Sequence, residues 1–466
     1  MALTQISTAG VKDDAVTAGK IPANAVGSSE LADNAVDTAA ITNDAVTEPK
    51  IADNAVTRAQ IIDGAINGAK CENQSIGAEK ITDGTIATAK IANNAVTTAK
   101  IADDAVTQAK LNFPVANRNL IINGAMQVAQ RGTSSTANNG YYTIDRIKQY
   151  YQDTDEAPTF SQADVASGTT PYTLGFRKSL KVTNGNQTSG AGVSDQIQII
   201  SWLEAQDIAN SGWNYKSSSS FLTFSFWIKS SVAQAFNFYV QTNDGTEKNM
   251  PFSTPSLSAD TWTKVEVQIK GDSGIDFNND NGMGLGLYLA PYLGTNYTDN
   301  SITNGEWITF ASGTRYKDVA TTWYTTNDAT VEYTGLQLEV GSVATDFEHR
   351  SYAQELFLCL RYYQIVRAAS ITAASTTAAR FNCPLLCKTR HSAPSVGKFG
   401  SGNIGIGDMV SYGSTSSATP SSDGYAADDL MMSCQVTAFS GLTQYRQYCH
   451  EVSGSQTGLI AVDAEL

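Results

Sequence analysis

The decapeptide IADNAVTRAQ, residues 51–60, is one unit of a ten-residue repeat that runs without insertion from Val11 to Lys110. The last three units read ITDGTIATAK, IANNAVTTAK and IADDAVTQAK, from residue 81 to residue 110. The first position of every unit is apolar and the sixth is β-branched. Asp or Asn dominates the third and fourth positions, and such pairs favour tight turns. A gapless period of this kind predicts a fibrous or solenoid array.

The apolar positions of the repeat lie five residues apart, whereas an amphipathic α-helix needs spacings of three and four. We expect one helical turn at T-x-A-K-I, capped by its Thr, and a short strand at A-V-T. Each unit has two medium-sized apolar side chains and no aromatic residue, so a single chain could not offset its ordering entropy. A disordered linker is the alternative, but a linker does not keep Ile and Val at fixed positions. We therefore predict a homotrimeric shaft, with a core of Ile21, Val26, Ile41, Val46, Ile51, Val56, Ile81, Ile86, Ile91, Val96, Ile101 and Val106.

Every aromatic residue lies at or after Phe113, so the repeat region contains none. Short β-rich runs then recur, such as FLTFSFWIKS from Phe221 and WTKVEVQIKG from Trp262. In the first of these runs Phe224, Phe226 and Ile228 alternate with their neighbours, a period of two that predicts strands with one buried face. Many short strands over this length favour a jelly-roll β-sandwich like that of carbohydrate-binding modules.

The repeat resembles the decapeptides of bacteriophage tail fibres and related virion appendages, in particular through KIADNAVT, residues 50–57. The opening MALTQIST is similar to that of structural proteins of marine and cyanobacterial phages. RNLIINGAMQVAQRGTSS, residues 118–135, and LQLEVGSVATDFEHRSYAQELFLCLRYYQ, residues 336–364, are similar to blocks that open and close the globular part of many phage fibres. The resemblance implies a virion fibre made in the host cytoplasm. A tail fibre for host adsorption is the first hypothesis, and a head, neck or collar fibre with a structural or auxiliary adhesion role stays open.

The resemblance also implies partners at the two ends of the chain. We expect the N-terminus to dock to a phage tail, neck or capsid protein, and the C-terminal half to bind a host surface polysaccharide. The N-terminus, MALTQISTAG, lacks the basic and apolar regions of a secretion signal, which a bacterial surface adhesin would need. The expected organisation is mainly β, with an attachment peptide at 1–10, a shaft at 11–110, a linker at 111–120, the sandwich at 121–350, a short helix and connector at 351–367, and a small β tip domain at 368–466.

Polysaccharide recognition needs exposed aromatic rings beside polar side chains that bond hydroxyl groups. Three pairs of residues fit this requirement, and the alternative for each pair is a place in the hydrophobic core. They are Trp323 and Tyr324, Trp213 and Tyr215, and Tyr445 and Tyr448. No pair of carboxylates stands out for glycoside cleavage. We therefore expect a binding protein and not an enzyme, with a capsule depolymerase as the competing hypothesis.

Other functions have weaker support in the sequence. Asp276 and Asp280, in DFNNDNG, predict either a surface calcium site or a plain hairpin loop. The spacing of Cys383, Cys387 and His391 is not that of a zinc finger, so buried thiols are the simpler interpretation and no other cofactor is expected. A net charge of −14 argues against nucleic acid binding, and no run of 18 apolar residues could insert into a membrane.

Overall fold

The computed structural model describes residues 12–37, 39–61, 91, 96–97, 101, 117–392, 394–408, 410, 412–415, 420–422, 430–451 and 458–466. These residues form a mainly β chain with several antiparallel sheets. The chain divides into two compact units, Met1–Ala102 and Asp103–Leu466. No helix in the described part of the chain is both long enough and apolar enough to cross a membrane.

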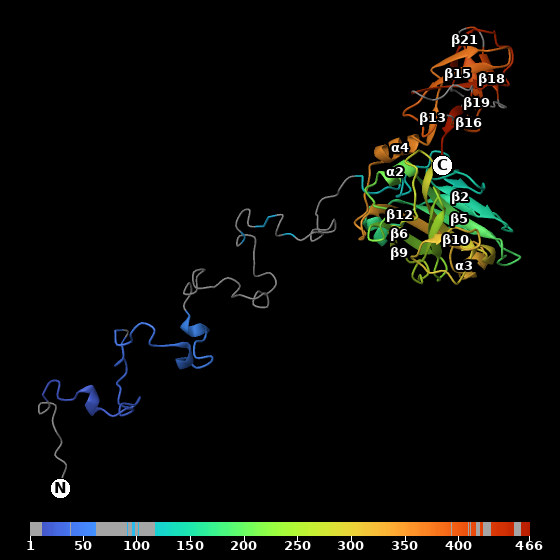
Figure 1. Ribbon diagram of the computed structural model, residues 1–466. Helices are drawn as coiled ribbons and strands as arrows, with labels where there is room; N and C mark the ends of the chain where they lie inside the picture. The colour runs from blue at the N-terminus through green and yellow to red at the C-terminus, as the bar shows by residue number, and fades with distance from the viewer. Residues whose placement is uncertain are drawn as a thin grey trace. The chain divides into compact units, whose positions relative to one another are not determined.

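Each described repeat of the first unit is built from tight turns (Figure 1). The fourth position adopts the left-handed conformation, with φ from 62° to 67°, in Asp14, Asn24, Asn34, Asp44 and Asn54. Asp and Asn tolerate this conformation better than other residues with a side chain, which explains their place in the repeat. A backbone hydrogen bond closes the turn, as from Ala55 N to Ala52 O at 3.0 Å. The T-x-A-K segment forms a 3₁₀ turn at η2 (Ala18–Lys20), η3 (Glu48–Lys50) and η4 (Arg58–Gln60).

The predicted cap and the predicted strand of the repeat were wrong for the described units. Thr17 and Thr47 stand at the N-cap positions of η2 and η3, but neither side chain accepts a capping hydrogen bond. No A-V-T segment among the described repeats belongs to a strand. The physical reason is that a strand needs a neighbour for its hydrogen bonds, and these segments lie alongside none in the single chain.

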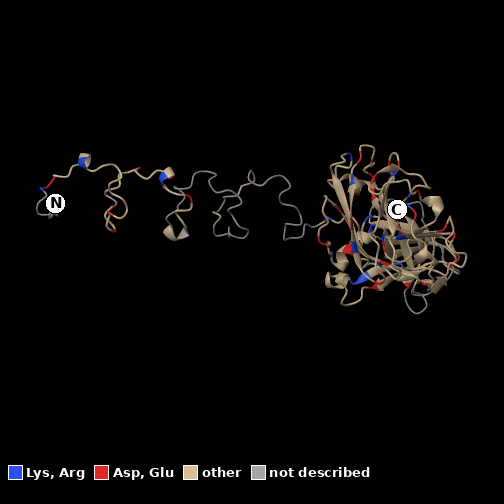
Figure 2. Ribbon diagram, turned by 90° about the horizontal axis from the view of Figure 1, so that it is seen from below, with Lys and Arg blue, Asp and Glu red and all other residues tan. Residues whose placement is uncertain are grey.

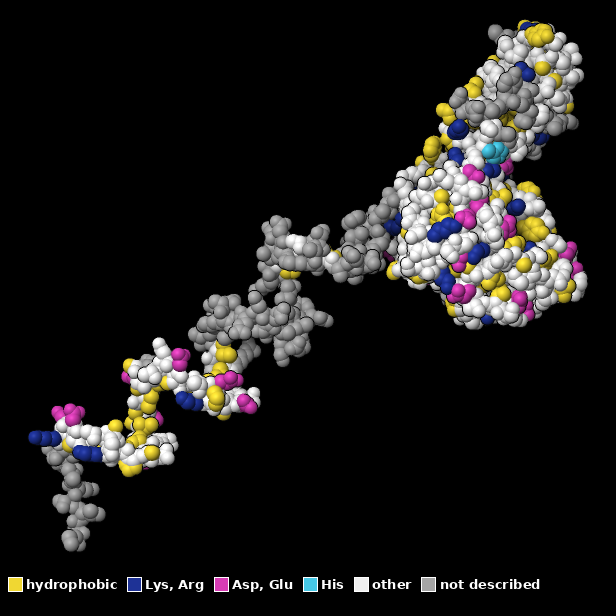
Figure 3. Space-filling view, in the orientation of Figure 1, with side chains coloured by type: hydrophobic (Ala, Val, Ile, Leu, Met, Phe, Trp, Pro, Cys, Tyr) yellow, Lys and Arg dark blue, Asp and Glu magenta, His cyan; other side chains and the backbone are white. Residues whose placement is uncertain are grey.

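The predicted core side chains of the shaft are exposed in the single chain. Between 40% and 56% of each side chain is exposed in Ile21, Val26, Ile41, Val46, Ile51, Val56, Ile91, Val96 and Ile101. Figure 3 shows such apolar side chains at the surface of the described repeats. Ile81, Ile86 and Val106 lie outside the described residues, as do residues 1–10, the predicted attachment peptide. The trimer therefore stays a prediction.

The second unit contains the predicted β-sandwich, two six-stranded antiparallel sheets around a common core (Figure 1). In order across the first sheet, the strands are β1 (Ser134–Ser135), β3 (Thr159–Asp164), β4 (Lys178–Thr183), β12 (Thr330–Val340), β6 (Phe221–Ser230) and β9 (Thr263–Lys270). In order across the second sheet, they are β11 (Ile308–Thr309), β8 (Lys248–Ser253), β7 (Asn237–Thr242), β10 (Met283–Leu293), β5 (Gln196–Glu204) and β2 (Lys148–Gln152). Short helices join the strands at α1 (Thr170–Thr173), α2 (Ala205–Ala209), η10 (Thr295–Tyr297) and α3 (Thr322–Thr325).

The alternation in β6 decides which of its side chains enter the core. Phe224, Phe226 and Ile228 enter the core, as the period of two predicted, but Thr223 and Ser225 on the other face are buried as well. The rings of Phe224 and Phe226 lie 6.1 Å and 5.2 Å from the ring of Phe238, which belongs to β7 of the opposite sheet. Burying each such side chain contributes about 1.5–3 kcal/mol to the stability of the fold. The packing of this aromatic cluster therefore holds the two sheets together.

A second hydrophobic core lies among the strands near the C-terminus. One sheet has the order β13 (Tyr363–Val366), β22 (Leu459–Asp463) and β16 (Ser395–Phe399). The other has the order β18 (Tyr412–Thr415), β17 (Ile404–Gly407), β21 (Gln447–Glu451), β14 (Ser370–Ala373), β15 (Ala379–Pro384), β20 (Met431–Val436) and β19 (Pro420–Ser422). Before these strands comes α4 (Tyr352–Leu360), close to the helix expected in this segment. A capping box between Ser351 and Gln354 begins α4.

Buried ion pairs tie the last residues of the chain to the sandwich. The carboxylate of Glu465 pairs with Arg146 and lies 3.3 Å from Arg131. Arg131 also pairs with Asp463, at the end of β22, at 2.9 Å. Both arginine side chains and that of Glu465 are less than one-tenth exposed. Such pairs stabilise a fold as long as both partners are present, because the loss of one leaves a buried charge unpaired.

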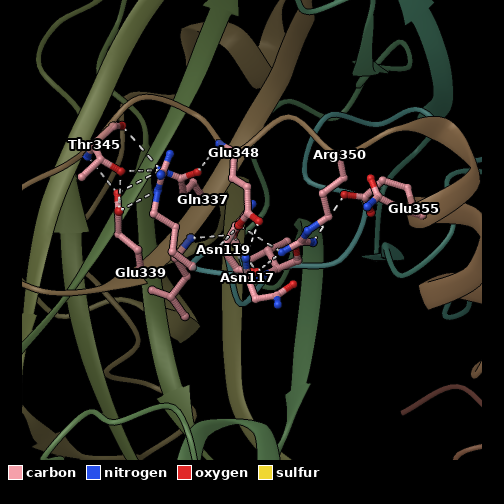
Figure 4. Close-up of polar contacts among 12 residues, drawn as sticks. Asn117, Asn119, Gln337, Glu339, Thr345, Glu348, Arg350 and Glu355 are labelled. Atoms are coloured by element: carbon pink, nitrogen blue, oxygen red, sulfur yellow. Dashed lines mark hydrogen bonds and ion pairs between the residues drawn. The ribbon is translucent and has the colours of Figure 1, made fainter. Parts of the chain in front are cut away.

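The two blocks that bracket the sandwich in sequence meet in space. Glu348 accepts hydrogen bonds from the backbone N–H groups of Asn117 and Asn119, at 2.6 and 2.7 Å (Figure 4). The Asn119 side chain in turn joins β12, donating to Leu336 O at 3.1 Å and accepting from Leu338 N at 3.0 Å. These contacts hold residues 117–119, the end of the predicted linker, against β12 and Glu348 of the sandwich.

Arg350 extends the same network toward α4 (Figure 4). Its guanidinium lies 3.3 Å from Glu348 and 3.4 Å from Glu355. Glu355 also accepts the backbone N–H of Asn123 at 2.7 Å, and burial raises the pKa of this carboxyl group. On the other side, Glu339 accepts the backbone N–H of Thr345 at 2.9 Å. The carboxylates of Glu339, Glu348 and Glu355 are therefore occupied by structural contacts.

Candidate functional site

The structure places Trp323 and Tyr324 in the sandwich core, which corrects the prediction that they contact a ligand. Both are completely buried in α3. Trp323 packs edge-on against Phe236, with ring centroids 6.2 Å apart, and Tyr324 stacks on Tyr292 at 4.0 Å. The Tyr324 hydroxyl donates to Asp195 at 3.0 Å. Polar side chains flank this pair in TTWYTTND, but a single helical turn directs both rings inward.

The pair Trp213 and Tyr215 also belongs to the packing of the sandwich. Trp213 is 3% exposed, and its indole N–H donates to Ser220 O at 3.2 Å. Tyr215 is half-buried and packs edge-on against Phe277 at 5.0 Å. Trp213 therefore offers no free ring face to a ligand, and Tyr215 offers part of one.

The last predicted pair is divided by the structure. Tyr448, in β21, is buried, and its hydroxyl oxygen accepts the backbone N–H of Thr443 at 3.1 Å. Tyr445 is 79% exposed and borders a recess of about 580 Å³, whose other described lining residues include Arg380, Asn382 and Gln444. Of the six predicted aromatic residues, Tyr445 alone stands mostly in solvent.

The predicted metal ligands are not brought together. Asp276 pairs with Lys216, and Asp280 accepts the backbone N–H of Gly282 at 2.8 Å, which is a turn contact. Among the residues described, no three His, Cys, Asp or Glu side chains form a group that could hold a metal ion. DFNNDNG lies in the connection between β9 and β10, which belong to different sheets, so the segment is a loop and the predicted hairpin was also wrong.

A cleft of about 240 Å³ lies on the outer face of the second sheet, at β2, β5, β7 and β10. The face arises from alternation: in QIQII of β5, Ile197 and Ile199 enter the core while Gln196 and Gln198 lie on the other side. The same period places Tyr288 of β10 on this face. The aromatic lining residues are Tyr150, Tyr239, Tyr288 and Phe310. The polar lining residues are Asn139, Lys148, Gln196, Gln198, Gln241 and Arg315.

Aromatic stacking makes part of the cleft rigid. Tyr288 lies parallel to Tyr239, with ring centroids 4.4 Å apart, and the edge of Trp202 meets it at 5.6 Å. Gly286 lies against the rings of Tyr288 and Trp202. A side chain does not fit at this position, because a Cβ there would lie 2.8 Å from Tyr288 and 2.9 Å from Trp202. Burial raises the pKa of Tyr288 well above its ordinary value, and that of Tyr150 as well. The phenols therefore stay neutral and can both donate and accept hydrogen bonds.

A chain of amides runs along the cleft beside the rings. The Tyr239 hydroxyl donates to Gln198 Oε1 at 3.1 Å, and Gln198 Nε2 donates to Gln196 Oε1 at 2.6 Å. The same oxygen of Gln196 accepts from Arg315 Nη1 at 3.1 Å. Gln196 Nε2 donates to Gln152 Oε1 at 3.0 Å. This chain fixes the orientation of each amide, so the cleft is organised before any ligand enters.

The sequence prediction missed the cleft entirely. The alternation of Gln with Ile in QIQII could have indicated it. Gln side chains at every second position of a strand predict a face that is polar and carries uncharged amides. The partners of these amides come from far along the chain: Arg315 lies 119 residues after Gln196. Gln196 lies in β5 and Arg315 lies in the connection between β11 and α3, so no local period of the sequence links them.

No protein-family model and no curated protein matches the sequence. Among solved structures, the chain is similar to the enzymatically active domain of tailspike protein 4 of bacteriophage CBA120, with 9% identity and a TM-score of 0.26 over 48% of this chain and 21% of that one. It is similar to a carbohydrate-binding module of family 4, with 13% identity and a TM-score of 0.24 over 47% of this chain and 99% of that one. It is also similar to a family 11 carbohydrate-binding module from Clostridium thermocellum, in complex with a β-1,3-1,4-mixed-linked tetrasaccharide, with 13% identity and a TM-score of 0.21 over 47% and 97% of the two chains. The chain thus spans about a fifth of the tailspike domain, and all three likenesses are distant.

Proposed function

We propose that this chain is a non-enzymatic virion fibre that binds a cell-surface polysaccharide through the cleft on the second sheet. The observation that supports binding most is the cleft itself, in which half-buried tyrosine rings lie beside an ordered chain of amides. Sugar rings stack their C–H faces on aromatic rings, and their hydroxyl groups pair with amides. Tyr150 and Tyr288 supply the rings, while Gln196 and Gln198 supply the amides.

Binding without cleavage is the simpler proposal for this cleft. Glycosidases use two carboxyl groups that flank the scissile bond. The described residues that line the cleft include no Asp or Glu. The carboxylate of Glu247, outside the lining, accepts a hydrogen bond from Gln241 Nε2 at 3.3 Å and so serves to orient that amide.

The repeat supports the fibre part of the proposal. Its apolar side chains recur every ten residues and are exposed in the single chain, so parallel copies in register would give each Ile and Val the same neighbours. Three copies would carry three clefts. Linking sites in this way can raise apparent affinity by about 10²–10⁴ without new contacts. The N-terminal residues 1–10 would dock to a tail, neck or capsid protein.

A binding experiment on the full chain tests the proposed function. Tyr150→Ala removes one ring of the cleft, and a stacked ring contributes about 1–3 kcal/mol by analogy with base stacking. We expect the variant to adsorb to host cells about tenfold more weakly. Tyr352→Ala is the matched control, because Tyr352 is 56% exposed on α4 and does not line the cleft. Equal adsorption by Tyr150→Ala and Tyr352→Ala would contradict the proposal that the cleft binds the polysaccharide.

A further inference from the structure

The cleft combines two cationic side chains with no carboxylate. Lys148 of β2 and Arg315 both line it, and none of its described lining residues is acidic. The chain as a whole has a net charge of −14. Elsewhere on the globular unit, basic and acidic residues are interspersed (Figure 2). A cationic cleft on an acidic protein therefore needs its own explanation.

Lys148 differs from most lysines of the sandwich. Six others each form an ion pair with a carboxylate at 2.9 Å or less, namely Lys178, Lys216, Lys229, Lys248, Lys264 and Lys270. Lys148 forms no ion pair with any residue that the structure describes, although it is half-buried. Its burial lowers the pKa of the ammonium group, and no neighbouring charge opposes that effect. An ammonium group held in this position gains from an anion that enters the cleft.

Arg315, like Lys148, lines the cleft without an acidic partner among the described residues. Its Nη1 donates to a neutral amide, Gln196 Oε1, and the guanidinium lies 4.7 Å from the ring of Tyr297. No ion pair joins it to a described carboxylate, and its Nε is buried without a hydrogen-bond partner among the described atoms. A guanidinium has five N–H donors in a fork that matches the oxygens of a carboxylate or a sulfate. The cleft thus holds two positive charges that form no ion pair with a carboxylate in the part of the chain that the structure describes.

We propose that the cleft selects an anionic polysaccharide, with a carboxylate or sulfate group against Lys148 and Arg315 while the sugar ring lies on the tyrosines. This inference rests on the proposed function, because it names the class of glycan that the same cleft binds. The volume of about 240 Å³ is below the about 300–1,000 Å³ of pockets for drug-sized ligands, so the cleft suits a single charged sugar unit of a chain.

The test compares matched charged and neutral polysaccharides on the full chain. The carboxylate pair is polygalacturonate and its methyl ester, and the sulfate pair is dextran sulfate and dextran. We expect at least one anionic member to bind at least tenfold more tightly than its neutral counterpart, with affinity that falls as salt rises. Lys148→Gln and Arg315→Gln should each weaken that binding about ten- to a hundredfold. Lys181→Gln, on β4 of the opposite sheet, should leave it unchanged.

The outcomes separate this inference from the proposed function. If neutral and anionic members bind equally, and Tyr150→Ala weakens both while Lys148→Gln weakens neither, the cleft binds glycans but the charge selection is wrong. If Lys181→Gln weakens binding as much as Lys148→Gln, the attraction is a general charge effect and the inference is likewise wrong. If neither anionic polysaccharide binds while Tyr150→Ala still weakens adsorption to host cells, the inference fails and the proposed function stands. The carboxylate and sulfate pairs identify which anion the cleft prefers.

Discussion

Replacing Glu348 by Ala should detach the segment that joins the sandwich to the repeat. Its carboxylate accepts two backbone N–H groups, from Asn117 at 2.6 Å and from Asn119 at 2.7 Å, and lies 3.3 Å from Arg350. The side chain is 9% exposed, so water replaces these contacts poorly. Hydrogen bonds to a charged group contribute about 1.5–3 kcal/mol each, which gives a loss of about 3–6 kcal/mol for the two.

Urea unfolding of the full chain, followed by tryptophan fluorescence, measures this loss. All six tryptophans lie between Trp202 and Trp323, so the signal reports on the sandwich alone. Glu348→Gln keeps one acceptor oxygen and should lose about half as much. Glu306→Ala is the control, because that carboxylate is 53% exposed in its pair with Lys270 and should change stability by only about 0–1 kcal/mol.

Hydrogen exchange at the same site gives a second readout. The amides of Asn117 and Asn119 should be protected in the parent chain and should exchange freely in Glu348→Ala. The reasoning is refuted if Glu348→Ala unfolds at the same urea concentration as the parent chain and keeps both amides protected.

Three further predictions follow from buried or exposed groups. Burial lowers the pKa of His450, whose Nδ1 accepts the backbone N–H of Ala368 at 3.3 Å, so the folded state favours the neutral ring. The unfolded chain then takes up the proton first, and stability measured by calorimetry should fall as the pH drops below about 6.5, less so in His450→Gln. Glu465→Ala leaves Arg146 buried and unpaired, and should cost about 3–5 kcal/mol in urea unfolding, whereas an unchanged midpoint would show that the ion pair contributes nothing. Deleting residues 11–110 should convert a trimer into monomers by sedimentation, and a trimer that persists would place the association elsewhere.

The sequence predicted those parts of the fold that depend on local patterns. β6 spans Phe221–Ser230, the run that the alternation of its side chains had indicated. The turn at the fourth position of each repeat was predicted from Asp and Asn, and the structure places Asn54 at φ 63°. The A-V-T strand was wrong because strand formation depends on a neighbouring strand, which composition does not supply.

The candidate site was less accessible to sequence reasoning. Burial of Trp323 and Tyr324 depends on how α3 packs against distant strands. The polar residues that flank this pair favoured exposed rings instead. The cleft joins Tyr150 and Gln196 through the long-range pairing of β2 with β5, and Arg315 reaches it from the connection between β11 and α3. Long-range pairings of this kind are not encoded in any local period. The alternating Gln side chains of β5 are a local pattern that points to the cleft.

The most direct test of the central claim is a structure of the full chain with a bound oligosaccharide of the polysaccharide that it binds most tightly. The account predicts sugar density in the cleft of the second sheet, with a ring on Tyr150 or Tyr288 and an anionic group within hydrogen-bond distance of Lys148 or Arg315. Sugar bound instead in the recess beside Tyr445, with the cleft empty, would contradict it.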